Sequence, residues 1–157
     1  MQLRRTLMIV LVTLSLMSTA IAKEQVPFKG TVTGQVVSVT PISQELLVFG
    51  VLVSGISTQL GRFKGEGEIF QNVVTGSYSG TFTWRAANGD SISGSFTGQL
   101  IPTSTPGVFE NSEEITVTSG TGRFLNVSGS AIADGQLDQN TSTFLFPFEG
   151  AISSVGS

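Results

Sequence analysis

The segment 108–119 carries the residue best suited to acid–base chemistry. Alternate residues of a strand share a face, and one face of this segment holds Phe109, Asn111, Glu113, Ile115 and Val117. Loss of hydration among apolar neighbours raises the pKa of a carboxyl group and suits it to general acid or base catalysis. We therefore predict that Glu113 points into the protein interior. A bulge near Asn111 would instead leave Glu113 on the solvated rim with Glu110 and Glu114.

Two other sets of side chains are candidates to act beside Glu113. In a predicted strand at 122–133, Asn126 shares a face with Phe124, so we expect its amide to point inward as well. A carboxylate and an amide in an aromatic interior are the minimum that a cyclase needs. Four aromatic residues either stack on a flat ligand or simply form the core, and these are Tyr78, Phe82, Trp84 and Phe96.

The composition of the chain excludes several kinds of site. The 157 residues include no cysteine and no histidine, so there is no disulfide, no zinc centre with Cys or His ligands and no His-dependent catalytic triad. A net charge of −3 without a basic cluster argues against nucleic acid or an anionic membrane as partner. We expect the protein to work without a cofactor.

One polar segment, 134–140, has oxygen ligands spaced loosely as in a calcium loop. It lacks the glycine and the terminal glutamate of the full calcium-binding pattern. A polar hairpin turn explains the same residues equally well. We therefore assign no metal site.

Residues 1–22 have the three parts of a cleavable secretory signal peptide. Two arginines precede an apolar run at 7–16, and the small-x-small pattern Ala-Ile-Ala follows at 20–22. The run is shorter than the ~20 residues of a membrane-spanning helix. We predict cleavage after residue 22, a secreted or extracytoplasmic location (periplasm or extracellular) without membrane attachment, and a single domain at 23–157.

The mature chain has the pattern of strands throughout. Apolar residues alternate with Ser and Thr, and Gly, Pro, Asn and Asp separate the alternating runs. The predicted strands are 29–40, 45–58, 61–72, 74–86, 91–101, 108–119, 122–133 and 142–153. Short connections favour a meander, which hides its edges by closing on itself. We predict an all-β, eight-stranded antiparallel up-and-down β-barrel, with a β-sandwich as the alternative.

The register of one hairpin follows from its side chains. A two-residue turn at Asn88-Gly89 would place the apolar residues of the two strands on opposite faces. A three-residue loop, 87–89, with Gly89 in the left-handed region, pairs Trp84 with Ile92 and brings the apolar faces together. This register also pairs rings with glycines, namely Phe82 with Gly94, Phe96 with Gly80 and Tyr78 with Gly98. Such pairing suits a strongly coiled sheet with a narrow interior.

The segment 118–130, Thr-Ser-Gly-Thr-Gly-Arg-Phe-Leu-Asn-Val-Ser-Gly-Ser, resembles the GGTGxFxxAxG motif of the allene oxide cyclase and dirigent barrels. Ser119 replaces the first glycine of that motif. The whole mature chain is similar in character to these barrels. The resemblance implies an eight-stranded antiparallel barrel of calycin type, often assembled as a trimer. In the plant members, catalysis depends on acidic and polar residues inside the barrel. The resemblance does not assign any of these catalytic residues to a position in this sequence.

Two classes of function remain on the sequence alone. The first is a non-catalytic secreted barrel that binds a small hydrophobic ligand or assembles with itself. The second is a cofactor-independent cyclase or isomerase of allene oxide cyclase type that uses Glu113. An interior filled with aromatic rings favours the first class or a structural role, and an open interior with one acid favours the second. The Pro-Thr-Ser-Thr-Pro connection at 102–106 is a candidate lid over one mouth of the barrel.

Overall fold

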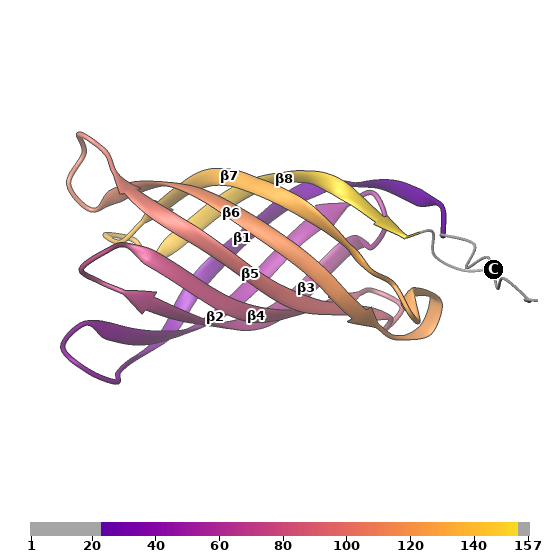
Figure 1. Ribbon diagram of the computed structural model, residues 1–157, viewed down its shortest axis with the longest axis horizontal. Helices are drawn as coiled ribbons and strands as arrows, with labels where there is room; N and C mark the ends of the chain where they lie inside the picture. Colours follow the sequence, from indigo (N-terminus) through magenta and orange to yellow (C-terminus); the bar gives the residue numbers. More distant parts are fainter. Residues whose placement is uncertain (1–22, 154–157) are drawn as a thin grey trace, which may run out of the picture.

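The computed structural model describes residues 23–153, which form one closed antiparallel barrel (Figure 1). The strands are β1 (Gln25–Pro41), β2 (Leu46–Ser57), β3 (Gly61–Asn72), β4 (Ser77–Ala86), β5 (Ser91–Pro102), β6 (Val108–Gly120), β7 (Gly129–Asp138) and β8 (Thr143–Ser153). Each strand pairs with the next, and β8 pairs with β1 from Gln25–Ser153 to Gln35–Thr143. The predicted eight-stranded up-and-down barrel is confirmed, and the sandwich alternative is wrong. The predicted signal peptide at 1–22 lies outside the described residues.

The β4–β5 hairpin has the predicted register. Trp84 pairs with Ile92, and the three predicted ring–glycine pairs are present along the same two strands. Residues 87–89 form the loop, closed by a hydrogen bond from the N–H of Ala86 to the carbonyl of Asp90 (2.8 Å). Gly89 has φ 94°, a backbone conformation that favours glycine. The inward face of β4 is buried from Tyr78 to Ala86, while its serines and Thr81 face solvent.

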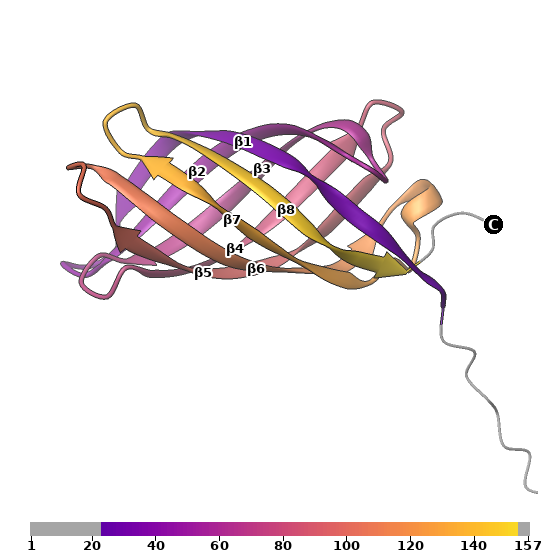
Figure 2. The same cartoon turned by 90° about the horizontal axis from the view of Figure 1, so that it is seen from above.

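The two ends of the barrel differ. One end, called here the plugged end, carries the connections 58–60, 87–90 and 121–128, and the other, called the four-loop end, carries 42–45, 73–76, 103–107 and 139–142. Figure 2 shows these two sets of loops at opposite ends of the barrel. Five residues with 4% exposure or less fill the plugged end, namely Phe28, Leu60, Phe124, Val127 and Ile152. Free space inside the barrel is therefore confined to the side of the four-loop end.

The predicted strand at 122–133 is wrong in its first half. Gly122–Phe124 form a short 3-10 helix, η1, and β7 begins only at Gly129. Gly122 has φ 59°, which an extended strand does not contain. The backbone of Arg123 is held by the carboxylate of Asp90, whose Oδ2 accepts from its N–H at 3.3 Å. The turn thus folds Phe124 inward as the plug instead of continuing the sheet.

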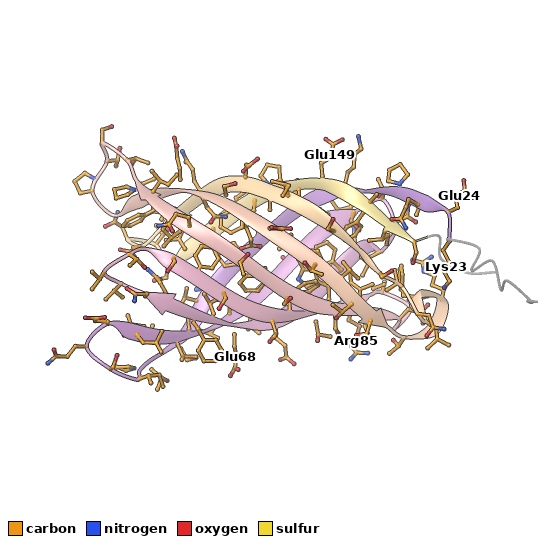
Figure 3. The ribbon with its side chains drawn as sticks, in the orientation of Figure 1. Lys23, Glu24, Glu68, Arg85 and Glu149 are labelled. Atoms are coloured by element: carbon orange, nitrogen blue, oxygen red, sulfur yellow. The ribbon has the colours of Figure 1, made fainter. Side chains whose placement is uncertain are left out.

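Most charged side chains lie on the outside of the barrel. Figure 3 shows Glu149 and Arg85 projecting from it, and Lys29 forms an ion pair with Glu149 at 2.6 Å. The segment 134–140, whose oxygen ligands are spaced loosely as in a calcium loop, contains the second half of β7 and a polar turn. In this turn Oδ1 of Asp138 accepts from the N–H of Asn140 (2.8 Å). Among residues 23–153, no three acidic side chains converge as a metal site. Within the same range, no helix has the length and apolar character to cross a membrane.

Candidate functional site

A cavity of about 300 Å³ occupies the lumen on the side of the four-loop end. Its walls are largely aliphatic and aromatic, with Val32, Val36, Val51, Val53, Ile69, Phe82, Trp84, Phe96, Leu100, Ile115, Phe144 and Phe146 among the lining residues. Val39, Leu47 and Ser142 line it near the four-loop end. The volume lies at the lower end of the range for small-molecule pockets.

The lumen stays hollow because aromatic rings lie over glycines of the adjoining strands. A Cβ at Gly34 would collide with the ring of Phe144, and a Cβ at Gly65 would lie 2.9 Å from Cδ1 of Trp84. Each ring therefore lies along the barrel wall, in space that a side chain on the next strand would otherwise take. This arrangement covers the wall with apolar surface and leaves the axis free.

Tyr78, Glu113 and Asn111 form a buried polar cluster in this apolar lumen. The phenol oxygen of Tyr78 lies 2.9 Å from Oε2 of Glu113, and it also forms a hydrogen bond with Oδ1 of Asn111. The three residues are 8%, 9% and 4% exposed, respectively. Tyr78 and Glu113 both line the cavity. The cluster is thus a localised set of hydrogen-bonding groups on an otherwise apolar wall.

The strand register explains how residues on two non-adjacent strands meet. Gly98 on β5 pairs with Tyr78 on β4 on one side and with Glu113 on β6 on the other. A Cβ at Gly98 would collide with the ring and hydroxyl of Tyr78. The absence of a side chain at Gly98 therefore lets the tyrosine cross β5 and reach the carboxyl group on β6.

Burial sets the protonation of the cluster. Loss of hydration raises the pKa of Glu113 from 4.5 to about 7, although the hydrogen bond from Tyr78 acts in the opposite direction. Burial also raises the pKa of Tyr78 above its ordinary value, and the negative charge of Glu113 raises it further. Glu113 is therefore the group of this cluster that changes protonation near neutral pH, while Tyr78 stays neutral.

The single hydroxyl proton of Tyr78 cannot serve two acceptors at once. When Glu113 is protonated, its carboxyl group can donate to the phenol oxygen while the phenol donates to Oδ1 of Asn111. When Glu113 is ionised, the phenol donates its proton in a hydrogen bond to the carboxylate and no longer to Oδ1 of Asn111. Nδ2 of Asn111 is buried and has no hydrogen-bond partner among the described residues. Such a donor is uncommon in protein interiors and points to a function for the cluster.

The structure places Glu113 as predicted and Asn126 elsewhere. The alternation along β6 is regular from Glu110 to Val117, so Glu113 points into the lumen. Asn126 follows η1 in a turn, is exposed and has φ 61°, so the prediction that its amide points inward is wrong. The alternation rule fails at Asn126 because the left-handed Gly122 ends the strand pattern before it.

The four predicted aromatic residues all line the cavity, and they also pack against other rings. Trp84 has its ring centroid 4.7 Å from those of both Phe63 and Phe82. The rings of Tyr78 and Phe96 meet edge to face at 6.1 Å. These residues therefore combine core packing with a place in the cavity wall.

Sequence reasoning assigned no role to Asn111 and treated Tyr78 only as a stacking surface. The alternation along 108–119 already placed Asn111 inward beside Glu113. A polar amide on this otherwise apolar face was therefore the sequence signal that could have identified Asn111 as part of the site. The hydroxyl contact with β6 had no local signature, because it crosses an intervening strand. The Pro-rich connection predicted as a lid does lie at the four-loop end, but 103–107 contribute no residue to the cavity lining.

No protein-family model matches the sequence, and no curated protein matches it. Among solved structures, the chain is similar to that of the pterocarpan synthase dirigent protein GePTS1. The similarity has a TM-score of 0.52, covers 91% of this chain and 98% of that chain, and is accompanied by 13% sequence identity. At this identity the similarity concerns the architecture alone: the chain has a dirigent-like β-barrel fold.

Proposed function

We propose that this protein binds a small hydrophobic ligand inside its barrel, without catalysing a reaction on it. The observation that carries the proposal is the apolar cavity of about 300 Å³ with Glu113 and Tyr78 on its wall. Ligand pockets typically combine such an apolar lining with a few polar groups that orient the molecule. Here the aromatic wall supplies contact area, and the buried cluster supplies the orienting hydrogen bonds.

Trp84 supplies a direct test, because it is the one tryptophan of the sequence and lines the cavity. The neutral fluorescent probe N-phenyl-1-naphthylamine should bind with saturable energy transfer from Trp84. Val53→Phe should weaken binding at least tenfold, since Val53 lines the cavity and a phenyl ring there would occupy it. Leu52→Phe is the matched control, because Leu52 is the preceding residue and 53% exposed on the outer face. Equal binding by both variants, or no saturable transfer in the wild type, would contradict the proposal.

Secretion and self-assembly belong to the same proposal. Export is supported by the signal-like pattern of residues 1–22. A homo-oligomer, a trimer by resemblance, is supported by the likeness of 118–130 to the barrel motif. N-terminal sequencing of exported protein should begin at Lys23, and light scattering of the purified barrel should give three times the monomer mass. Material that begins at Met1, or a monomeric mass, would contradict the respective part.

A cofactor-independent cyclase or isomerase of allene oxide cyclase type is the second candidate, because an open lumen with one acid on its wall is the arrangement expected of such an enzyme. The observation that favours it is a carboxyl group whose pKa burial raises to about 7, hydrogen-bonded to a phenol at a cavity wall. A group with that pKa can both give and take a proton near neutral pH. Ring closure of an apolar epoxide substrate should then be faster with the wild type than with Glu113→Gln, while the fluorescent probe binds both. Unchanged turnover in the variant would remove the enzymatic candidate.

A further inference from the structure

We propose that the cavity selects hydrophobic amines, with the ammonium group of the ligand paired to the carboxylate of Glu113 and its apolar part along the aromatic wall. The inference rests on the proposed binding function and names the ligand class. It arises from Glu113, which projects a carboxyl group into an apolar lumen without a positive partner among the described residues, and from the charge distribution on the outer surface.

The charged residues that border the cavity are all acidic. Only Glu113 projects its carboxyl group into the lumen, because Glu66 belongs to the exposed face of β3 and Asp138 ends β7 with its Oδ1 accepting from the N–H of Asn140. Among the described residues, no lysine or arginine lines the cavity. A ligand with a carboxylate would place a second negative charge beside Glu113 without a counter-ion. A ligand with an ammonium group would instead supply the missing positive charge.

The surroundings of Glu113 contain no positive partner on any strand packed against it. Facing it are the hydroxyl of Tyr78 from β4, Gly98 on β5 and Ala133 on β7, together with Asn111 on its own strand β6. The hydroxyl of Tyr78 hydrogen-bonds to the carboxyl group, but none of these groups can neutralise its charge. A buried carboxylate without a counter-charge is costly, and an ion pair with a ligand removes part of that cost.

Charged residues on the outer surface are distributed unequally between the two ends of the barrel. All six cationic residues of 23–153 lie in the half toward the plugged end, namely Lys23, Lys29, Arg62, Lys64, Arg85 and Arg123. Figure 3 shows Lys23 and Arg85 toward that end and Glu68 nearer to the opposite one. Glu45, Glu110 and Asp138 lie at or near the four-loop end. The field at the cavity side of the molecule therefore attracts a cation and repels an anion.

Binding of an ammonium ion requires Glu113 to be ionised. In the empty barrel at acid pH, the carboxyl proton must leave for solvent as the ammonium binds, so one proton is released for each ligand bound. Because burial raises the pKa of Glu113 to about 7, affinity for an amine should fall nearly tenfold for each pH unit below that value. The affinity for an alcohol of the same length should change little over the same range.

The experiment compares octylamine, 1-octanol and octanoate as competitors of N-phenyl-1-naphthylamine. At about pH 8 the amine should displace the probe at a concentration at least tenfold lower than the alcohol, and octanoate should be the weakest. Glu113→Gln should bring the amine to the level of the alcohol. Glu114→Gln is the matched control, because Glu114 is the next residue on β6 and is exposed. It should leave the order of the three ligands unchanged.

The outcomes separate this inference from the proposed function. If the neutral probe does not bind, the proposed function fails. If the probe binds but octanoate displaces it as well as octylamine does, the inference is overturned and the binding function stands. Should Glu113→Gln not fold, calorimetry of octylamine binding to the wild type at about pH 6, in buffers of different ionisation enthalpy, decides the matter. Release of nearly one proton supports the pairing with Glu113, and release of none refutes it.

Discussion

The ring of Tyr78 crosses β5 directly above Gly98, in the space where any other residue would place its Cβ. This crossing brings the tyrosine hydroxyl to within 2.9 Å of Oε2 of Glu113 on β6. The polar cluster in the lumen therefore depends on an unsubstituted position on the strand between its members. Four predictions test this arrangement and its setting.

Replacing Gly98 by alanine should destabilise the protein and disturb the cluster. The added methyl group would collide with the ring and hydroxyl of Tyr78, and overpacking of this kind costs about 1–3 kcal/mol. Ser95→Ala on the exposed face of the same strand should change the free energy of unfolding by less than about 0.5 kcal/mol. Denaturant unfolding of the two variants measures the difference. Equal costs would mean that the tyrosine does not lie over Gly98.

The stability of the wild type should depend on the ionisation of Glu113. Burial raises the pKa of this acid from 4.5 to about 7, so the folded state holds the proton more tightly than the unfolded state. The free energy of unfolding should therefore fall as pH rises from about 4.5, by about 3 kcal/mol in all, and level off above the folded pKa of about 7.

The Glu113→Gln variant should lack this fall, because the amide does not ionise. Urea titrations of the two proteins at several pH values in this window provide the measurement. Glu114→Gln is the exposed control and should retain the wild-type slope. Parallel curves for wild type and Glu113→Gln would show that the carboxyl group is hydrated in solution.

The one tyrosine of the sequence allows its ionisation to be followed without interference. Burial and the charge of Glu113 both raise the pKa of Tyr78. At one unit above the ordinary tyrosine pKa of about 10, the folded protein should show little tyrosinate absorbance. Adding guanidinium chloride at the same pH should produce it fully. Circular dichroism confirms that the barrel stays folded, and an ordinary titration curve in folded protein would contradict the buried position.

Gly122 should tolerate substitution less well than Gly61, although both have left-handed backbone with φ 59° and 66°. A Cβ at Gly122 would collide with the carboxylate of Asp90, whereas a Cβ at Gly61 meets nothing within 4 Å. Gly61→Ala should therefore cost only the backbone strain of about 1 kcal/mol. Gly122→Ala should cost distinctly more, because it also displaces Asp90 from Arg123 in the turn that carries the plug.

Thermal unfolding of the two alanine variants measures this difference. The double variant Gly122→Ala with Asp90→Gly should show a smaller cost for the alanine than the single variant does, since the colliding carboxylate is gone. Identical melting temperatures for Gly61→Ala and Gly122→Ala would show that Asp90 does not hold the turn.

The strands and the side of the sheet on which each residue lies could be predicted from the sequence. Period-two alternation is a local property of extended backbone, so it placed Glu113 inward and set the pairing of Trp84 with Ile92 without knowledge of the rest of the fold. It failed at Asn126, where one left-handed glycine converts the start of a predicted strand into a turn. A pattern of side chains does not report a backbone angle of that kind.

Only the tertiary structure decided which inward residues meet and whether space remains between them. The contact of Tyr78 with Glu113 joins β4 to β6 and depends on how far a ring extends over the strand between them. The cavity depends on rings such as that of Phe144 lying against the wall over Gly34 instead of filling the axis. Both are consequences of barrel curvature and ring orientation, which are properties of all the strands together. Alternation along one strand determines the face of a residue, but the closed sheet determines its neighbours.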